Sequence, residues 1–265
     1  MRNKKLLVVI AFFFIIFFAI IYSSKVEAAR VLYFKFNKDN EYRERRNFIA
    51  DLSFNNNNGR TQRGWARWDA NGGPEGDGAY NFDGTDDRIT VQDSNTLSAN
   101  TTGQLTISMW VKFMGTEFVG EGSHKDYIHF LGKSNNGNNE YVFRQYNSSN
   151  DEGRGNRISF YLFNLNGGLG AGSYFQEPII IGEWMHIVGV ANGTHVQVWK
   201  NGVLKDADTY SGYNIRPENG EAPLNLGTSD GNSHFRGSID ELKIYDRALT
   251  FSEIRGLSEG RDVGG

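Results

Sequence analysis

Oxygen-bearing side chains that could hold a hard cation are concentrated in polar, loop-like segments of the chain. Calcium takes about six to eight oxygen ligands from carboxylates, amides and backbone carbonyls. The candidate ligands are Asp39, Asp51, Asn55, Asp83, Asp86, Asp87 and Asp240. Their spacing is not that of an EF-hand loop, but their chemistry favours calcium. The alternative is that Asp83, Asp86 and Asp87 hold turns through local hydrogen bonds and that Asp240 is a hydrogen-bonding residue at a strand end.

The paired carboxylates that glycoside hydrolysis requires are not evident. Retaining glycosidases hold two carboxyl groups about 5–5.5 Å apart, and no strand-like run here carries alternating acids. Glu117 and Glu121 flank a glycine-rich loop and Glu140 begins a strand alone, which favours solvated charges. No acid or nucleophile is suitably placed beside the histidines, which are His124, His129, His186, His195 and His234. Cysteine is absent, which excludes a thiol nucleophile. Because no catalytic arrangement is recognisable, the sequence predicts a protein that is not an enzyme.

Aromatic side chains in polar loops could stack on a sugar, because a sugar ring has an apolar C–H face and a rim of hydroxyls. The predicted ligand-binding residues are Trp65 and Trp68 in "RGWARWD", Tyr210 and Tyr213 in "TYSGYN", and Trp110. Trp110 lies on the polar face of its strand, where we expect it to look onto a concave sheet. Further candidates are Tyr174 and Phe175. The alternative for each residue alone is packing under a loop.

The elements that must position these residues are short strands. Aromatic residues make up 14% of the chain, with 32 glycines and 4 prolines, which favours many strands joined by tight turns. In "LTISMWVKF", residues 105–113, the apolar positions alternate with Thr106, Ser108, Trp110 and Lys112, so the odd positions are predicted to face the core. Similar runs cover most of the chain and predict an antiparallel protein of two packed sheets.

Turn and cap residues refine this prediction. Hairpins are predicted at Asn201-Gly202, Asn192-Gly193 and Asp83-Gly84, because such pairs accept positive φ. The first two would join residues 183–205 into a three-stranded meander. Thr250 and Glu253 fit a capping box, so a short helix is predicted to begin at Phe251, with Leu249 and Ile254 spaced as a hydrophobic staple.

The N-terminal segment differs from the rest of the chain. Arg2, Lys4 and Lys5 precede an apolar run over residues 6–22, and Val26 and Ala28 lie where a signal peptidase reads small residues. Residues 1–28 are therefore predicted to be a signal peptide of a secreted, extracellular protein. The alternative is an uncleaved anchor that leaves the protein on the cell surface. Residues 29–258 are predicted to form one domain, followed by a flexible tail over residues 259–265.

Charge excludes one class of partner. The formal net charge is −3, and the body of the chain contains no block or stripe of Lys and Arg. Nucleic-acid binding needs a basic surface. It is therefore not predicted.

Several motifs together resemble a known family. "YNFDGTDDRITV", "LTISMWVKF", "EWMHIVGVANGTHVQVWKNGVLKD" and "GSIDELKIYDRALTFSEIRGL" occur in the order typical of concanavalin A-like jelly rolls of the laminin G-like type. The resemblance implies a two-sheet β-sandwich whose final strand and helical turn lie beside its first strand. It also implies that a calcium site would join Asp240 of "GSIDE" with the "DLSFNNNNG" loop, which contains Asp51.

The function expected from these observations is binding. Jelly rolls of this type include lectins, adhesion modules, structural domains and glycosidases. With no catalytic pair in view, we expect a secreted lectin-like module that binds polysaccharide or glycoprotein glycans, assisted by calcium with Asp39, Asp51 and Asp240 as ligands. The alternative is an extracellular structural protein that assembles with copies of itself, and a glycosidase is less favoured.

Overall fold

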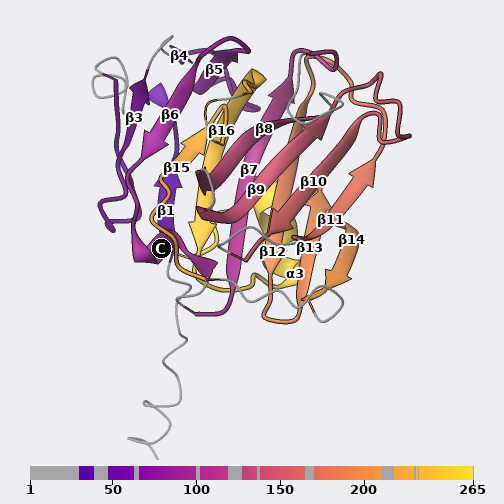
Figure 1. Cartoon of the computed structure of the whole chain (residues 1–265). Helices are drawn as coiled ribbons and strands as arrows, with labels where there is room; N and C mark the ends of the chain where they lie inside the picture. Colours follow the sequence, from indigo (N-terminus) through magenta and orange to yellow (C-terminus); the bar gives the residue numbers. More distant parts are fainter. Residues whose placement is uncertain are drawn as a thin grey trace, which may run out of the picture.

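The computed structural model describes residues 30–38, 47–62, 66–99, 102–118, 127–135, 138–164, 170–210, 218–229, 231 and 233–264. Within these residues, two eight-stranded antiparallel sheets pack face to face (Figure 1). Sheet A has the order β14 (Val203–Thr209), β13 (His195–Lys200), β12 (Trp184–Ala191), β7 (Leu105–Phe113), β16 (Arg236–Tyr245), β5 (Ala79–Asp83) and β4 (Arg67–Asp69), with β1 (Arg30–Phe34) paired to β16. Sheet B has the order β11 (Ala171–Gln176), β10 (Arg157–Leu162), β9 (Asn138–Tyr146), β8 (Tyr127–Asn135), β15 (Leu224–Leu226), β6 (Arg88–Val91), β3 (Gly59–Gln62) and β2 (Phe48–Ile49). The predicted two-sheet sandwich is confirmed.

The core lies between the sheets and follows the predicted strand phase. Leu105, Ile107, Met109, Val111 and Phe113 of β7 are all completely buried. Lys112 and Trp110 face the opposite way and are half-buried. The period-two pattern of this strand was therefore sufficient to assign its inner face.

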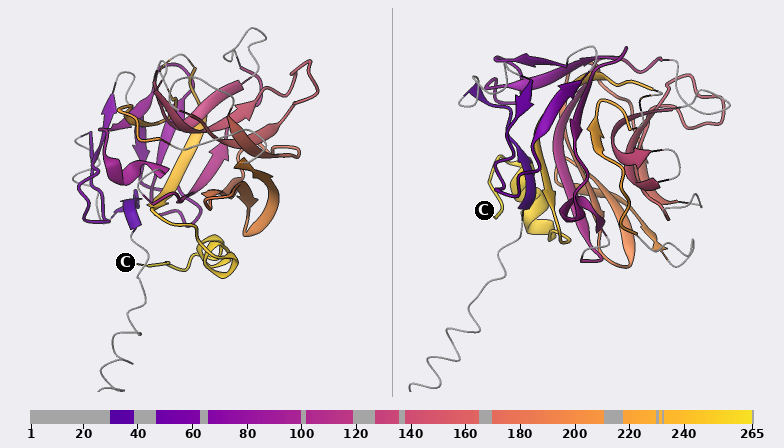
Figure 2. Two further views of the ribbon diagram at one scale, coloured as in Figure 1. Left: turned by 60° about the horizontal axis from the view of Figure 1, so that its bottom comes forward. Right: turned by 60° about the vertical axis from the view of Figure 1, so that its left-hand side comes forward.

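The end of the chain closes the sandwich, as the resemblance implied. Strand β16 pairs with β7 and β5, and β1, the first strand in the chain, also pairs with β16. Helix α3 (Phe251–Ser258) begins at a Thr250–Glu253 capping box, which confirms that prediction. Figure 2 shows α3 against the outside of sheet A, where Ile254 packs in a second apolar cluster with Val188 and Tyr245.

The segment after α3 is not a free tail in this structure. Asp262 forms a 2.7 Å ion pair with Arg30 at the start of β1. Val263 packs against the apolar cluster beneath α3. These contacts involve two residues of the predicted tail, residues 259–265.

Two of the three predicted hairpins are present. Asn201 and Gly202 have φ of 50° and 75° between β13 and β14, and the Asn192-Gly193 turn joins β12 to β13, so the meander is confirmed. The third prediction is wrong. Asp83-Gly84 joins β5 of sheet A to β6 of sheet B, and these strands do not pair. The turn is a corner between the layers, because its residues permit positive φ but do not select the next partner.

None of the described helices has the length and apolarity needed to cross a bilayer. The predicted signal peptide, residues 1–28, lies outside the described residues.

Candidate functional site

The outer face of sheet A contains a polar cavity of about 760 Å³ beside α3. Its lining includes Trp110 from β7, His186 from β12 and Asp240 from β16. The strand register brings these three together, because Trp110 pairs with His186 on one side and with Asp240 on the other. Trp110 therefore faces away from the core, as predicted, and its ring centroid lies 5.3 Å from that of His186. We call this space the sheet A cavity.

Asp240 is buried in this cavity, and only one of its two carboxylate oxygens has a hydrogen-bond partner. Its Oδ1 accepts a hydrogen bond from the Glu241 backbone N–H at 2.8 Å, whereas its Oδ2 is buried without a partner. Burial, followed by the nearby charge of Glu241, raises the pKa of Asp240 to about 8. An orphaned carboxylate oxygen in such a place is costly unless a proton or a cation satisfies it.

Other oxygens converge on the same point. A Cβ at Gly73, where φ is +86°, would lie 2.6 Å from Asp240 Oδ2, 2.5 Å from the Gly78 carbonyl oxygen and 3.4 Å from Asp77 Oδ1. Asn37, whose Nδ2 donates to Asp77 Oδ2, has a buried Oδ1 with no partner. We call Asn37, Asp77, Gly78 and Asp240 the oxygen cluster. Carboxylate, amide and carbonyl oxygens are the ligands that calcium prefers, so these residues fit a calcium ion.

Asp51 lies elsewhere and its carboxylate is fully used. Oδ1 accepts from the backbone N–H groups of Tyr33 and Ser53, and Oδ2 accepts from the Ser53 hydroxyl and the Asn57 N–H, at 2.8–3.0 Å. Asp51 organises its own loop and does not line the sheet A cavity. The resemblance implied that Asp51 and Asp240 share a site. In the structure, the Asp51 carboxylate instead serves its own loop, and only Asp240 lines the sheet A cavity. Asp39 lies outside the described residues.

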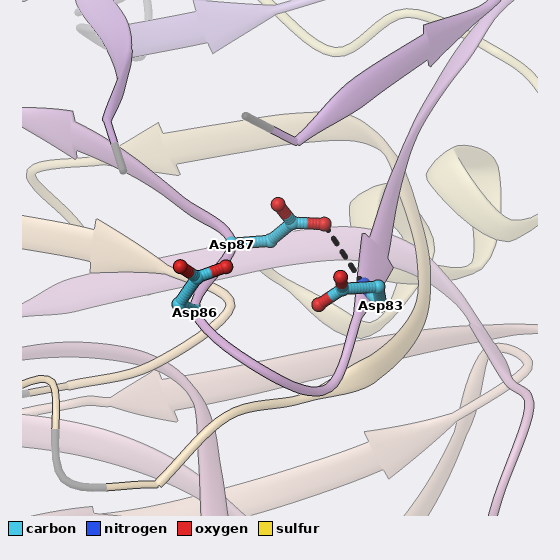
Figure 3. Close-up of side chains that lie close together, drawn as sticks. All are labelled: Asp83, Asp86 and Asp87. Atoms are coloured by element: carbon cyan, nitrogen blue, oxygen red, sulfur yellow. Dashed lines mark hydrogen bonds between the residues drawn. The ribbon is translucent and has the colours of Figure 1, made fainter. Parts of the chain in front are cut away.

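Asp83, Asp86 and Asp87 form a second acidic group at the corner between the sheets. Carboxylate oxygens of the three lie within 4.8 Å of one another (Figure 3). Asp83 Oδ1 accepts from the Thr85 N–H at 2.7 Å, and Asp87 Oδ2 accepts from the Asp83 N–H at 2.9 Å. These are the local turn bonds of the alternative interpretation. Burial raises the pKa of Asp87.

The predicted sugar-stacking aromatics fall into different environments. Trp68 is half-buried against the core, and its indole N–H donates to the Phe36 carbonyl at 2.7 Å. Tyr210 is only 8% exposed within the main core, and burial raises its pKa to about 12. Tyr210 therefore has little ring surface for a ligand, whereas the Trp68 side chain is partly exposed. Trp65 and Tyr213 lie outside the described residues.

Glu140, one of the acids considered for glycoside hydrolysis, has no acidic partner among the other acids considered that the structure describes. Glu140 is buried against Lys133 and accepts the Gly220 N–H at 3.0 Å, and burial raises its pKa. His186 Nε2 lies 2.8 Å from Ser108 Oγ, and its Nδ1 has no partner. Burial lowers the pKa of His186 to about 3, so this imidazole is neutral at physiological pH. Glu121 lies outside the described residues.

The outer face of sheet B contains a group of residues of which the sequence predicted only Tyr174 as a candidate for ligand binding. Cross-strand pairing places His129 opposite Arg144, Arg144 opposite Ser159, and Ser159 opposite Tyr174, from β8 to β11. The same face carries two further rows of long polar and aromatic side chains. We call it the arginine–tyrosine face, and it comprises Tyr127, Arg144, Tyr146, Arg157, Tyr161 and Tyr174.

Each arginine of this face lies against two tyrosine rings. The guanidinium carbon of Arg144 is 4.4 Å from the ring centroid of Tyr127 and 4.7 Å from that of Tyr161. For Arg157 the distances are 3.8 Å to Tyr174 and 5.7 Å to Tyr146. Each cation–π contact of this kind stabilises the arrangement by about 0.5–1 kcal/mol at an exposed site.

A glycine allows one of these rings to lie flat on the sheet. A Cβ at Gly172, directly across from Tyr161 on β11, would collide with the Tyr161 ring. The Tyr161 ring therefore uses the space above Gly172 and stacks beside Phe163, with centroids 6.0 Å apart and planes 20° from parallel. The signal in the sequence was the alternation of aromatic and charged residues in "YIHFLGK", "EYVFRQY" and "RISFYLFN".

Comparison with known proteins identifies the family. A family model described as the concanavalin A-like lectin/glucanases superfamily matches residues 83–255, more than half of the chain. The chain belongs to the concanavalin A-like lectin/glucanase superfamily. The superfamily's description covers both lectins and glucanases, so membership does not by itself decide between binding and catalysis. A search of curated protein sequences finds no match.

Two of the solved structures with a similar fold are described as binding domains. The botulinum neurotoxin serotype D binding domain is 16% identical, with a TM-score of 0.63, and the match covers 88% of this chain and 51% of that one. The binding domain of Paraclostridial Mosquitocidal Protein 1 is 17% identical, with a TM-score of 0.64, covering 88% and 52%. This chain thus spans about half the length of each of the two solved chains. At this level of identity, the similarity concerns the fold alone.

Proposed function

We propose that the chain is a secreted, non-catalytic module that binds polysaccharide or glycoprotein glycans on the outer face of sheet B. The observation that carries this proposal is the arginine–tyrosine face. Aromatic rings bind the C–H faces of sugars, and side chains with several donors bind their hydroxyls. Tyr174 is 39% exposed, and Tyr127 and Tyr161 are half-buried, so aromatic surface remains available to a ligand.

The contacts within the face support binding over a purely structural role. The residues stand on four adjacent strands of one sheet, and their rings are held by the arginines between them. A site that is ordered before the ligand arrives loses less conformational entropy on binding. The similar solved structures are named as binding domains, which agrees with this function.

Calcium has a structural role in this proposal. The oxygen cluster would hold the ion, with ligands from Asn37, Asp77, Gly78 and Asp240. The ion would satisfy the orphaned oxygens of Asn37 and Asp240 and would tie the 71–78 loop to β16. Since the cluster lies on sheet A, we expect calcium to stabilise the fold without contacting the glycan.

A glycan array followed by calorimetry tests the binding function. Tyr174→Ala should weaken binding of the best array ligand by about 1–2 kcal/mol, as expected for an aromatic contact in a binding site. Phe54→Ala is the matched control, because Phe54 is 92% exposed and lies away from the arginine–tyrosine face. Absence of any glycan ligand, together with filaments or rings of purified protein, would instead support assembly with copies of itself.

A further inference from the structure

We propose that the ligand of the arginine–tyrosine face is an anionic saccharide, one that carries carboxylate or sulfate groups. This inference rests on the proposed function, because it names the class of glycan bound at the same face. It is carried by the charge state and hydrogen bonding of Arg144 and Arg157.

Both arginines lack a negative partner. In the part of the chain that the structure describes, Arg144 and Arg157 form no ion pair, whereas nearby Arg154 lies 3.2 Å from Glu152. A guanidinium remains charged at all relevant pH values. The face therefore presents two fixed positive charges that no described carboxylate neutralises.

The hydrogen bonds of these arginines leave much of their donor capacity for a ligand. The described bond of Arg144 is made by Nε, which donates to His129 Nε2 at 3.0 Å. Arg157 donates through Nη2 to Gln176 Oε1 at 3.2 Å, and because its Nε is buried, the donors left for a ligand are the remaining N–H groups of its two Nη atoms. Planar guanidinium groups bind carboxylate and sulfate-like oxygens through two parallel hydrogen bonds. An acidic substituent matches these donors better than a neutral hydroxyl does.

The tyrosine rings indicate that the anion belongs to a sugar. A small free anion would use the guanidinium groups alone and would leave the exposed ring of Tyr174 without a role. That ring lies 3.8 Å from the Arg157 guanidinium carbon, so one ligand residue can contact both. Stacking on the ring and pairing with the guanidinium would together select a saccharide unit with an acidic group.

The test compares two anionic polymers with their neutral counterparts. Polygalacturonate is compared with methyl-esterified polygalacturonate, and dextran sulfate with dextran, by calorimetry at about 0.15 M salt, where long-range charge effects are screened. Arg144→Gln and Arg157→Gln remove one charge each from the face. The matched control is Arg255→Gln, because the Arg255 side chain is 61% exposed on α3. Melting curves establish that each variant is folded.

We expect at least one anionic polymer to bind and its neutral counterpart to bind at least about tenfold more weakly, a difference of ~1.4 kcal/mol. Each variant of the face should weaken that binding by about tenfold and Arg255→Gln by less than about twofold. The polymer that binds, carboxylated or sulfated, identifies the acidic group. Equal binding of charged and neutral polymers, with Tyr174→Ala still harmful, would overturn this inference and leave the proposed function intact. Equal losses in all three arginine variants would show non-specific attraction and overturn it, and no binding to any glycan would overturn both.

Discussion

At the residue scale, buried polar side chains differ in how many of their oxygen atoms have hydrogen-bond partners. Asp51 is fully hydrogen-bonded within its loop, whereas Asp240 Oδ2 and Asn37 Oδ1 have no partner. Burial of an ionised carboxylate without a partner is unfavourable. This contrast separates an acid that builds a loop from an acid that is suited to a cation.

Asp240 gives the first prediction. If the oxygen cluster holds calcium, chelation should lower the melting temperature of the wild-type protein. For calcium initially at 100 times its dissociation constant, removing it should lower the free energy of unfolding by about 2.7 kcal/mol. Asp240→Asn should abolish this response, and Asp51→Asn should retain it while lowering stability in both conditions. Calorimetric melts with and without chelator measure the effect. A wild-type melt that chelator leaves unchanged would contradict the calcium site.

Gly172 gives a second prediction at this scale. Gly172→Ala places a methyl group where the Tyr161 ring lies, so the ring must move and glycan affinity should fall by about 1–2 kcal/mol. Gly103→Ala is a control for glycine replacement, because a Cβ there meets nothing within 4 Å, although its φ of 74° adds some strain. Unchanged affinity in folded Gly172→Ala protein would show that the Tyr161 position is unimportant.

At the element scale, strand β7 and helix α3 carry the clearest relation between pattern and structure. Val111 is completely buried while its neighbour Lys112 faces outward, with its Nζ 5.0 Å from the Trp184 ring centroid. Val111→Asp should therefore cost more than about 4 kcal/mol and unfold the domain. Lys112→Asp loses one cation–π contact and should cost about 1 kcal/mol or less. Urea denaturation compares the two, and similar tolerance of both would contradict the strand phase.

The α3 cap gives a prediction about pH. The hydrogen bonds from Arg247 lower the pKa of Glu253 to about 2. A carboxyl group whose pKa is lower in the folded state stabilises that state above its unfolded pKa of about 4.3. The free energy of unfolding of the wild type should therefore exceed that of Glu253→Gln by its full amount above about pH 5. This difference should disappear as the pH falls toward about 2. Denaturant unfolding across this range measures it, and a difference that does not change with pH would refute the role of this carboxylate.

The elements were largely predictable from the sequence, and so were single site residues such as Asp240 and Tyr174, but the groups of residues that form the sites were not. Local signals such as the alternation in residues 105–113 and the Thr250–Glu253 cap depend only on near neighbours. The Asp83-Gly84 turn was assigned to a hairpin because turn residues do not reveal which sheet the next strand joins. The oxygen cluster joins Asn37 and Asp77 to Asp240 across most of the chain, and the arginine–tyrosine face depends on the register of four strands. Neither juxtaposition is encoded locally.

At the scale of the whole molecule, the two outer faces of the sandwich carry different groups of residues. The outer face of sheet A is covered in part by α3 and contains the oxygen cluster beside the Trp110–His186 pair. The outer face of sheet B, in the described residues, carries the arginine–tyrosine face. Calcium and glycan would therefore bind on opposite faces. We expect chelation to weaken glycan binding only at temperatures where it also unfolds the protein.

The most direct test of the central claim is a titration of isotope-labelled protein with an oligosaccharide ligand, followed by NMR chemical shifts of the backbone amides. We expect the largest changes in β8 to β11, around Arg144, Arg157 and Tyr174, with little change around Trp110. Changes confined to the sheet A cavity would contradict the proposal that the glycan binds on sheet B.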